Sequence, residues 1–380
     1  MRKVIVIFLS LLLAVAMMAG CQPSAPTETE VPVSEEPVAT EEPAAPVEEE
    51  PATEEKTTEG MKIAYMVSEL SNEFHQARAE AAKQYALEAY GAEVIVVDGK
   101  SDDNVQIQNV DLLVTSDFDG ASLQIWSDEA AEASIKAAID AGIAMTSFFS
   151  PIETTGIPCV QSDEAGGSFA MGKSAAEQWV AAHPDIPITT IQIGWPDLKE
   201  VIDGRTAPFV AGIESVVGKG NYTDLGCLGT NSSADAAKEG VASALATNPE
   251  INIIYSEAGN LTPGTMDALK DIGRGVMENN VPLTEIVCSV DCPVSEMKDI
   301  FDPTSSLKMS LGLPPIETSK TIIDTIVAVY LGEIAQVSNP NEVIIASAKP
   351  IDGYSISMAD ALAWYNEQFG TALTEADLAK

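Results

Sequence analysis

Residues Met61 to Gly91 read MKIAYMVSELSNEFHQARAEAAKQYALEAYG and follow the pattern of one strand, one loop and one helix. The short apolar run Ile63–Val67 is typical of a strand buried in a parallel sheet. Glu73–Tyr90 is rich in Ala, Glu, Gln and Leu, which predicts a helix that ends at Gly91, a common C-cap residue. The stretch therefore indicates an α/β fold.

The loop between this strand and this helix carries the first candidate binding residues. In open α/β sheets, ligands bind beyond the carboxyl ends of the strands. The side chains at this point are Ser68, Glu69, Ser71, Asn72, Phe74 and His75.

The rest of the chain repeats the alternation of strand and helix. Further strands are expected at 93–97, 120–125, 143–148, 158–161, 188–193, 223–228, 251–256, 284–290, 307–313 and 342–346. Further helices are expected at 104–116, 128–141, 164–182, 201–217, 233–247, 262–275, 316–331 and 358–368. This alternation predicts right-handed crossovers and parallel sheets, and the two successive series predict two similar lobes.

The first 21 residues resemble the signal sequence of a bacterial lipoprotein. Arg2 and Lys3 precede the apolar run Val4–Met18, and Ala19-Gly20-Cys21 follows as in a lipobox, with Met18 where Leu is more usual. This predicts removal of residues 1–20 and acylation of Cys21, which would anchor the chain outside the cytoplasm, on the outer face of the cell membrane or in the periplasm. A plain signal peptide or a membrane anchor is the alternative.

Residues 21–60 are expected to form an extended, lipid-anchored acidic linker. Gln22–Gly60 contains 12 Glu and one Lys, seven prolines and no aromatic residue, so it cannot bury enough apolar surface to fold. It contributes −11 to a formal net charge of −38, which means that the remainder is strongly acidic too. This charge argues against nucleic acid, or a bare anionic membrane surface, as a partner.

Four segments resemble the sugar-binding branch of the type I periplasmic binding proteins, the ribose-binding-protein-like receptors of ABC importers. KIAYMVSELSNEFH is similar to the family's first strand and its Asn-x-Phe-aromatic loop, and QNVDLLVTSDFDGASLQ to its helix and Val-Asp-Gly strand. AAIDAGIAMT is similar to an Ala-Gly-Ile-Pro-Val run, with Ala144 in place of proline, and SDEAGGSFAMG to the first crossing between lobes. The resemblance covers nearly all of residues 61–348.

The resemblance implies two Rossmann-like lobes joined by a three-segment hinge. The crossings are expected near Ser162, Gly312 and 343–347, which gives one lobe at 61–162 plus 313–342 and the other at 163–312 plus 343–380. It also implies a monomeric, lipid-anchored receptor that binds a small ligand, a sugar in the first instance, and delivers it to an ABC permease. No catalysis and no cofactor are expected. The alternatives are a ligand-sensing module for a chemoreceptor or histidine kinase, and a receptor for a nucleoside or an autoinducer.

Two residues match charged positions of the family's binding site. Arg205 precedes Phe209 by four residues in DGRTAPF, as the family's ligand-clamping arginine does, and its planar fork can donate to two acceptors. The alternative is a surface arginine at a helix start. Asp291 follows the strand ending at Val290, where the family has an acceptor aspartate, although an aspartate there could also cap the next helix.

The other candidates lie in loops that follow strands. Asn72 and Phe74 match the family's first loop, and His75 takes the place of a second aromatic residue, where it could stack, hydrogen-bond or lie on the surface. Aromatic faces suit the C–H patches of sugars. The remaining candidates are Trp126 and Trp195 as aromatic platforms, Phe149, Gln124, Glu257 and Asn260. By contrast, Trp179 and Trp364 lie in expected helices and are assigned to the core.

The sequence departs from the family at two positions. Phe148-Phe149-Ser150 stands where sugar-binding members usually have an Asp-Arg or Asp-x pair, and Gly312 where ribose receptors have Gln. We therefore expect a roomier and more apolar pocket than a simple pentose needs.

The remaining cysteines and histidines indicate no metal site. Cys288 and Cys292 could form a local disulfide, but Cys159, Cys227, Cys288 and Cys292 allow three complete pairings, and buried free thiols are the favoured state. His75 and His183 are far apart in sequence. We find no nucleophile elbow, phosphate-binding glycine loop or zinc motif, so an enzyme is the weaker hypothesis.

Overall fold

The computed structural model describes residues 56–378, except for 153, 231–232 and 338–342. The expected signal peptide, Cys21 and most of the acidic linker lie outside the described residues. Within the described part, no helix combines the length and the apolar character needed to cross a bilayer.

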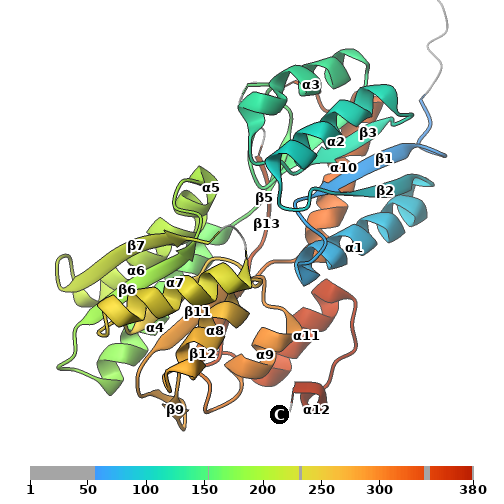
Figure 1. Cartoon of the computed structure of the whole chain (residues 1–380). Helices are drawn as coiled ribbons and strands as arrows, with labels where there is room; N and C mark the ends of the chain where they lie inside the picture. The colour runs from blue at the N-terminus through green and yellow to red at the C-terminus, as the bar shows by residue number, and fades with distance from the viewer. Residues whose placement is uncertain (1–55, 153, 231–232, 338–342, 379–380) are drawn as a thin grey trace, which may run out of the picture. The chain divides into compact units, whose positions relative to one another are not determined.

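The first sheet has the strand order β13-β5-β4-β3-β1-β2 and is parallel throughout (Figure 1). Its strands are β1 (Lys62–Val67), β2 (Glu93–Asp98), β3 (Gly120–Leu123), β4 (Ala144–Phe148), β5 (Cys159–Ser162) and β13 (Val343–Ala346). Helices α1 (Glu73–Tyr90) and α10 (Pro315–Leu331) cover one face, and α2 (Asp103–Thr115) and α3 (Asp128–Asp140) cover the other.

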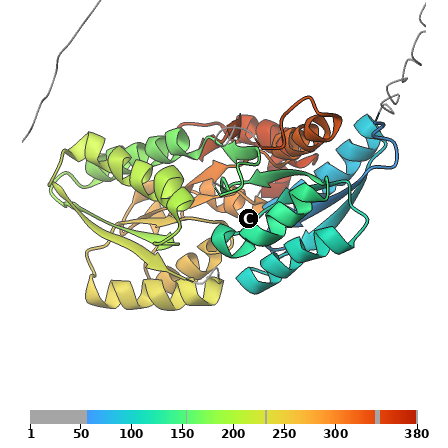
Figure 2. The same ribbon diagram turned by 90° about the horizontal axis from the view of Figure 1, so that it is seen from above.

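The second sheet has the order β14-β12-β11-β8-β6-β7, which repeats the first sheet position by position. Its strands are β6 (Ile188–Gly194), β7 (Tyr222–Gly229), β8 (Ile253–Ser256), β11 (Ile286–Val290), β12 (Leu307–Gly312) and β14 (Lys349–Asp352). Its helices are α4 (Glu164–Ala182), α5 (Lys199–Val201), the π-helical turn η1 (Ile202–Thr206), α6 (Ala207–Val217), α7 (Ala234–Thr247), α8 (Thr262–Asp271), α9 (Val294–Ile300), α11 (Met358–Phe369) and α12 (Glu375–Leu378). Helices flank both faces of this sheet as well, as the perpendicular view in Figure 2 also shows.

Strand β1 shows why the sheets are buried on both sides. Ile63, Tyr65 and Val67 belong to the core cluster beneath α1 and α10, whereas Ala64 and Met66 belong to the cluster beneath α2 and α3. Side chains alternate between the two faces of a strand, so a continuous apolar run is needed where both faces are covered. The predicted α/β class with mainly parallel sheets is confirmed.

The first helix begins and ends where its sequence indicates. The Asn72 Oδ1 atom accepts a hydrogen bond from the Phe74 N–H and caps α1. Gly91 ends the helix in the left-handed conformation, with φ of 64°.

Several expected elements differ from the structure. The helix expected at 201–217 is divided by η1, and the helix expected at 262–275 ends at Asp271. The sheets are not wholly parallel, because β14 pairs antiparallel with β12 and a small antiparallel hairpin joins β9 (Met277–Glu278) to β10 (Val281–Pro282). These pairings depend on contacts between distant segments, which hydrophobic periodicity does not report.

The chain passes between the two sheets three times. It leaves the first sheet after β5, returns from β12 to α10, and leaves again between β13 and β14. Strand β13 pairs with β5, so residues Val343–Ala346 belong to the first sheet.

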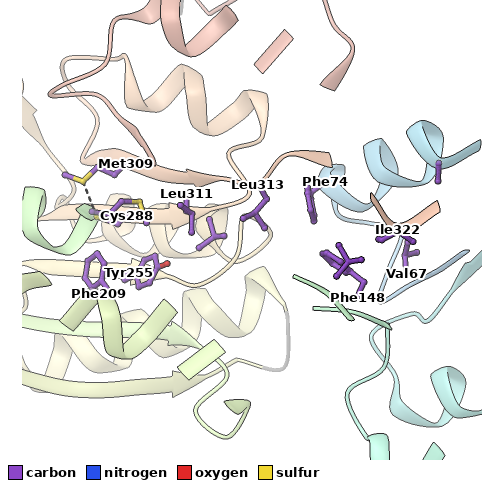
Figure 3. Close-up of a cluster of buried hydrophobic side chains, with 14 of the residues drawn as sticks. Val67, Phe74, Phe148, Phe209, Tyr255, Cys288, Met309, Leu311, Leu313 and Ile322 are labelled. Atoms are coloured by element: carbon purple, nitrogen blue, oxygen red, sulfur yellow. Dashed lines mark hydrogen bonds between the residues drawn. The ribbon is translucent and has the colours of Figure 1, made fainter. Parts of the chain in front are cut away.

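A continuous cluster of buried side chains, part of which is drawn in Figure 3, includes residues of both sheets. Leu311 and Leu313 belong to this cluster together with Phe74 and Phe148 from the first lobe and Phe209 from the second. Trp179 is 3% exposed in the same cluster, as predicted for a core residue, and Trp364 is partly buried against the core of the second lobe.

Candidate ligand-binding site

The carboxyl ends of the central strands in both sheets lead into one cavity. Its lining residues are Ser68, Glu69, Asn72, Phe74, His75, Gln124, Trp126, Phe148, Phe149, Trp195, Leu198, Val201, Arg205, Ala258, Asn260, Asp291 and Leu313. They follow β1, β3 and β4 in the first sheet and β6, β8, β11 and β12 in the second. We call this cavity, with the loops that line it, the cleft.

Ten of the eleven residues predicted to bind ligand line the cleft; the exception is Glu257. Glu257 is fully buried behind the cleft, where its carboxylate accepts hydrogen bonds from the Trp195 N–H and the Thr206 hydroxyl. Burial raises the pKa of Glu257, although these bonds oppose the shift. We therefore expect Glu257 to orient the Trp195 loop, a role that its place at a strand end did not reveal.

The first lobe supplies a connected set of polar groups. Ser68 Oγ lies 2.9 Å from His75 Nε2, and the Ser68 N–H donates to Gln124 Oε1 at 3.2 Å. His75 is 8% exposed, which excludes the surface position considered for it. Burial, and then the charges of Arg78 and Arg205, hold the pKa of His75 well below its ordinary value. The imidazole is therefore neutral at physiological pH.

Arg78 is a buried residue that the sequence pattern did not single out. It is 0% exposed on α1, and its Nη1 donates to Gln124 Oε1 at 3.1 Å and lies 3.2 Å from His75 Nδ1. The guanidinium also lies 3.5 Å from the centroid of the Phe148 ring. Position i+4 from Phe74 places Arg78 on the buried face of α1, and that spacing was the available signal.

The second lobe presents Arg205 from the π-helical turn η1. Its Nε and Nη2 donate to the two carboxylate oxygens of Glu164 at 2.6 and 3.1 Å, and its Nη1 donates to the Glu257 carbonyl oxygen. Burial alone would lower the pKa of Arg205, but the Glu164 carboxylate outweighs it and the net shift is upward. Arg205 is thus a fixed cation on the cleft wall, and its guanidinium lies 5.2 Å from the Phe149 ring centroid.

Asp291 connects the two lobes across the cleft. Its Oδ2 accepts hydrogen bonds from Asn72 Nδ2 at 3.0 Å and from the Gly259 N–H at 3.1 Å. A second bridge runs from Asn260 Nδ2 to Glu69 Oε1 at 3.1 Å. These bonds join the two sides of the cleft, where the cavity measures about 70 Å³.

Two cleft residues have strained backbone. Phe149 has φ of 73° and Asp291 has φ of 78°, both in the left-handed region. Such conformations cost on the order of 1–3 kcal/mol and tend to occur at functional sites. Hydrogen bonds retain them: the Phe149 N–H donates to the Val160 carbonyl and the Asp291 N–H to the Leu311 carbonyl.

The lining includes the apolar side chains that the sequence led us to expect, and the cavity itself is small. Phe74, Phe148, Phe149, Leu198 and Leu313 all contribute to the wall. At about 70 Å³ the cavity is far below the roughly 300 Å³ at which ligand pockets usually begin.

An outer groove of about 620 Å³ adjoins the cleft, and Trp126 and Trp195 line both. The other departure from the family, Gly312, has a packing explanation. A Cβ atom at Gly312 would lie 2.3 Å from the Trp364 ring.

Four cysteines lie in the part of the chain that the structure describes. Cys159, Cys227, Cys288 and Cys292 are free thiols, and burial raises the pKa of each. In the described part of the chain, no three His, Cys, Asp or Glu side chains are grouped so that they could hold a metal ion.

Both the sequence and the fold are similar to those of known proteins. A family model described as a periplasmic binding protein domain matches residues 63–333. A comparison with curated proteins finds no match.

Three solved structures illustrate the similarity of fold. An ABC transporter solute binding protein from Mycobacterium smegmatis with bound glycerol is 21% identical, over 80% of this chain and 96% of that one, with a TM-score of 0.64. One from Burkholderia graminis in complex with D-arabinose is 17% identical, over 78% and 96%, with a TM-score of 0.63. The 5-methylthioribose transporter solute binding protein from Thermotoga lettingae, in complex with 5-methylthioribose, is 15% identical, over 84% and 95%, with a TM-score of 0.65.

Proposed function

Since the chain belongs to the family of periplasmic binding protein domains, we propose that it is the extracytoplasmic substrate-binding component of an ABC importer and that its ligand is a small sugar. The observation that carries the proposal is the cleft. Fixed polar groups and aromatic rings from both sheets line the same cavity, at the carboxyl ends of parallel strands. Hydroxyl groups need such fixed donors and acceptors, and the C–H faces of sugars pack on aromatic rings.

The similar solved structures support this ligand class. Those from Burkholderia graminis and Thermotoga lettingae contain D-arabinose and 5-methylthioribose, respectively. The proposed ligand-binding residues are Asn72, Phe74, His75, Gln124, Trp126, Phe149, Trp195, Arg205, Asn260 and Asp291, all of which line the cleft. We further propose that the three passages between the sheets, near Ser162, Gly312 and Ala346, form a hinge, and that ligand in contact with both lobes favours closure.

Membrane attachment belongs to the same proposal. Ala19-Gly20-Cys21 after an apolar run supports acylation of Cys21, and the acidic linker would then hold the folded part away from the membrane. Expression with a radiolabelled fatty acid tests this. The label should appear in the wild-type chain and not in Cys21→Ser, and equal labelling of both would contradict the anchor.

A thermal-shift screen of the full chain, unfolded and refolded to remove retained ligand, tests the proposed function. Pentoses, hexoses, polyols, disaccharides, nucleosides and amino acids would be compared. A ligand at about 100 times its Kd should stabilise the protein by about 2.7 kcal/mol, which is a shift of several degrees. If no sugar raises the melting temperature, the sugar assignment is wrong.

Asp291→Asn is the variant of choice for locating the binding site. Asparagine tolerates a positive φ, so the turn is kept while the charged acceptor is lost. Arg205→Ala is less informative, because it would leave Glu164 buried and unpaired and would cost stability directly. Asp291→Asn should reduce the sugar-induced shift, whereas the exposed control Asp271→Asn should retain it. If the sugar raises the melting temperature of Asp291→Asn as much as that of the wild type, Asp291 does not contribute to sugar binding.

A further inference from the structure

Arg78 is a buried cation with no ion-pair partner in the described part of the chain. It is 0% exposed, and its Nε and Nη2 atoms have no hydrogen-bond partner there. A buried charge without a contacting counter-ion opposes folding, and an apolar side chain of similar volume would be tolerated better. The contact with the Phe148 ring offsets part of this cost, but the guanidinium still lacks the paired carboxylate that a buried charge usually has.

The contacts of Arg78 decide which atoms of the cleft wall carry hydrogen. A guanidinium can only donate hydrogen bonds, so His75 Nδ1 accepts from it and the neutral ring carries its hydrogen on Nε2. That hydrogen is donated to Ser68 Oγ, 2.9 Å away. Ser68 then does not need its own hydroxyl hydrogen for this contact. Since Ser68 lines the cleft, the hydroxyl can donate that hydrogen to a ligand.

Gln124 is oriented in the same way. Its Oε1 atom accepts from Arg78 Nη1 at 3.1 Å and from the Ser68 N–H at 3.2 Å. Two donors on this oxygen fix the amide orientation and leave the amide hydrogens to donate. Gln124 also lines the cleft, so the first-lobe wall offers two donors side by side.

The opposite wall of the cleft carries a hydrogen-bond acceptor. Asp291 Oδ2 accepts from Gly259 and Asn72, and its carboxylate retains further capacity to accept. We propose that Arg78 is a positioning residue that acts through His75 and Gln124 to make the first-lobe wall a donor surface. The cleft then selects ligands that present acceptor oxygens to Ser68 and Gln124 and hydroxyl or amine hydrogens to Asp291.

The ligand in this inference is that of the proposed function, but the role of Arg78 can be tested without any ligand. The chain has only two histidines, His75 and His183. The ring ¹⁵N shifts of the full chain, assigned with a His183→Gln variant, report tautomer and charge directly. We expect His75 to carry hydrogen on Nε2 alone and its pKa to lie well below that of an ordinary histidine, because the ring is buried and the cations Arg78 on α1 and Arg205 on η1 act on it.

Arg78→Met removes the donor to Nδ1 while it keeps the length of the side chain. In this variant His75 should change tautomer or begin to titrate, and the melting temperature should stay the same or rise. Lys83→Met, which removes an exposed cation from the same helix, should change neither. A wild-type ring with hydrogen on Nδ1, or an unchanged ring in Arg78→Met, would overturn the inference.

The selectivity is tested with the best-bound sugar among D-ribose, D-arabinose, D-galactose and D-glucose. Arg78→Met should raise the Kd for that sugar at least tenfold. Monodeoxyfluoro analogues of that sugar keep a weak acceptor but cannot donate, so they should be tolerated at the positions facing Ser68 and Gln124 and rejected at those facing Asp291. A fall in melting temperature with an unchanged Kd would make Arg78 merely structural. If none of the four sugars binds, the best-bound sugar of the thermal-shift screen replaces them. If no sugar binds at all, the proposed function is at fault, and the histidine spectra still decide the role of Arg78.

Discussion

Glu296 is a carboxyl group buried behind the turn that presents Asp291 to the cleft. It is 3% exposed and accepts hydrogen bonds from the hydroxyls of Ser289 at 2.6 Å and Ser310 at 2.7 Å. Ser310 Oγ in turn accepts from the Cys292 N–H at 3.0 Å. Cys292 and Asp291 both have positive φ, so this hydroxyl network supports the strained turn from behind.

The stability of the protein should therefore depend on the ionisation of Glu296. Burial raises its pKa to about 8, although the surrounding hydroxyls oppose the shift. Between about pH 4.5 and 8 the unfolded chain releases a proton that the folded chain retains, so stability falls as the pH rises. Glu296→Gln removes this loss and should be more stable than wild type at pH 8 by roughly 2–4 kcal/mol, with the difference vanishing near pH 5.

Urea unfolding of both proteins from pH 5 to 8.5 measures this difference. Glu333→Gln, an exposed substitution, serves as the control and should follow the wild-type curve. Parallel pH profiles for wild type and Glu296→Gln would show that Glu296 ionises normally in the folded protein.

Single residues were predictable where local spacing carries the information. Asn72 and Gly91 flank an obvious helix, and Trp126, Trp195 and Asp291 follow obvious strands. Arg78 was not predictable, because a charged residue in a helix is normally solvated and only its distant neighbours Gln124 and Phe148 show otherwise.

At the scale of elements, the contact between α4 and α6 determines where η1 places Arg205. A Cβ atom at Gly172 of α4 would lie 2.0 Å from the Phe209 carbonyl oxygen, and one at Gly212 of α6 would lie 2.2 Å from that of Phe169. The two helix backbones thus touch at glycine. Since α6 continues directly from η1, this close crossing also sets the distance between Arg205 and Glu164 of α4.

Gly172→Ala should push the helices apart, because backbone atoms cannot yield as a flexible side chain would. We expect a loss of about 1–3 kcal/mol in chemical denaturation and a weaker sugar-induced thermal shift. Gly166 is in the same helix, and a Cβ atom added there would have no neighbouring atom within 4 Å, so Gly166→Ala should instead stabilise by about 0.4–1 kcal/mol. Similar effects for both substitutions would contradict the close crossing.

Most elements follow from hydrophobic periodicity, whereas η1 and β14 do not. A π-helical turn accommodates one extra residue, and its benefit here lies in the Arg205 contacts with Glu164 and the Glu257 carbonyl, far away in sequence. The antiparallel strand β14 exists because the edge of β12 is open to pairing at Met309–Gly312, which depends on the assembled sheet.

At the scale of the whole molecule, the cleft is closed by two side-chain bridges, Asn72 to Asp291 and Asn260 to Glu69. Partly buried hydrogen bonds of this kind contribute about 0.5–1.5 kcal/mol each. Without ligand, the free-energy difference between the open and closed forms should therefore be small. A bound sugar would have to replace these bridges, because the cavity of about 70 Å³ leaves too little room beside them.

Asn72→Asp should shift this balance towards the open form. It retains the helix cap but places a carboxylate against Asp291, a repulsion of about 1–4 kcal/mol at this distance. Small-angle X-ray scattering of the ligand-free variant should give a larger radius of gyration than wild type. Asn221→Asp, in the exposed loop before β7, should leave the radius unchanged, and no increase for Asn72→Asp would mean that the bridge does not hold the lobes.

The four described cysteines make the molecule convenient to observe in motion. Cys159, Cys288 and Cys292 are buried, Cys227 is half-buried, and the raised pKa of each thiol suppresses the nucleophilic thiolate. With Cys21 acylated or replaced, a maleimide dye would react first with cysteines introduced at exposed sites. With one fluorophore on each lobe, fluorescence energy transfer would report the distance between the lobes. Single molecules could then be followed as they open and close.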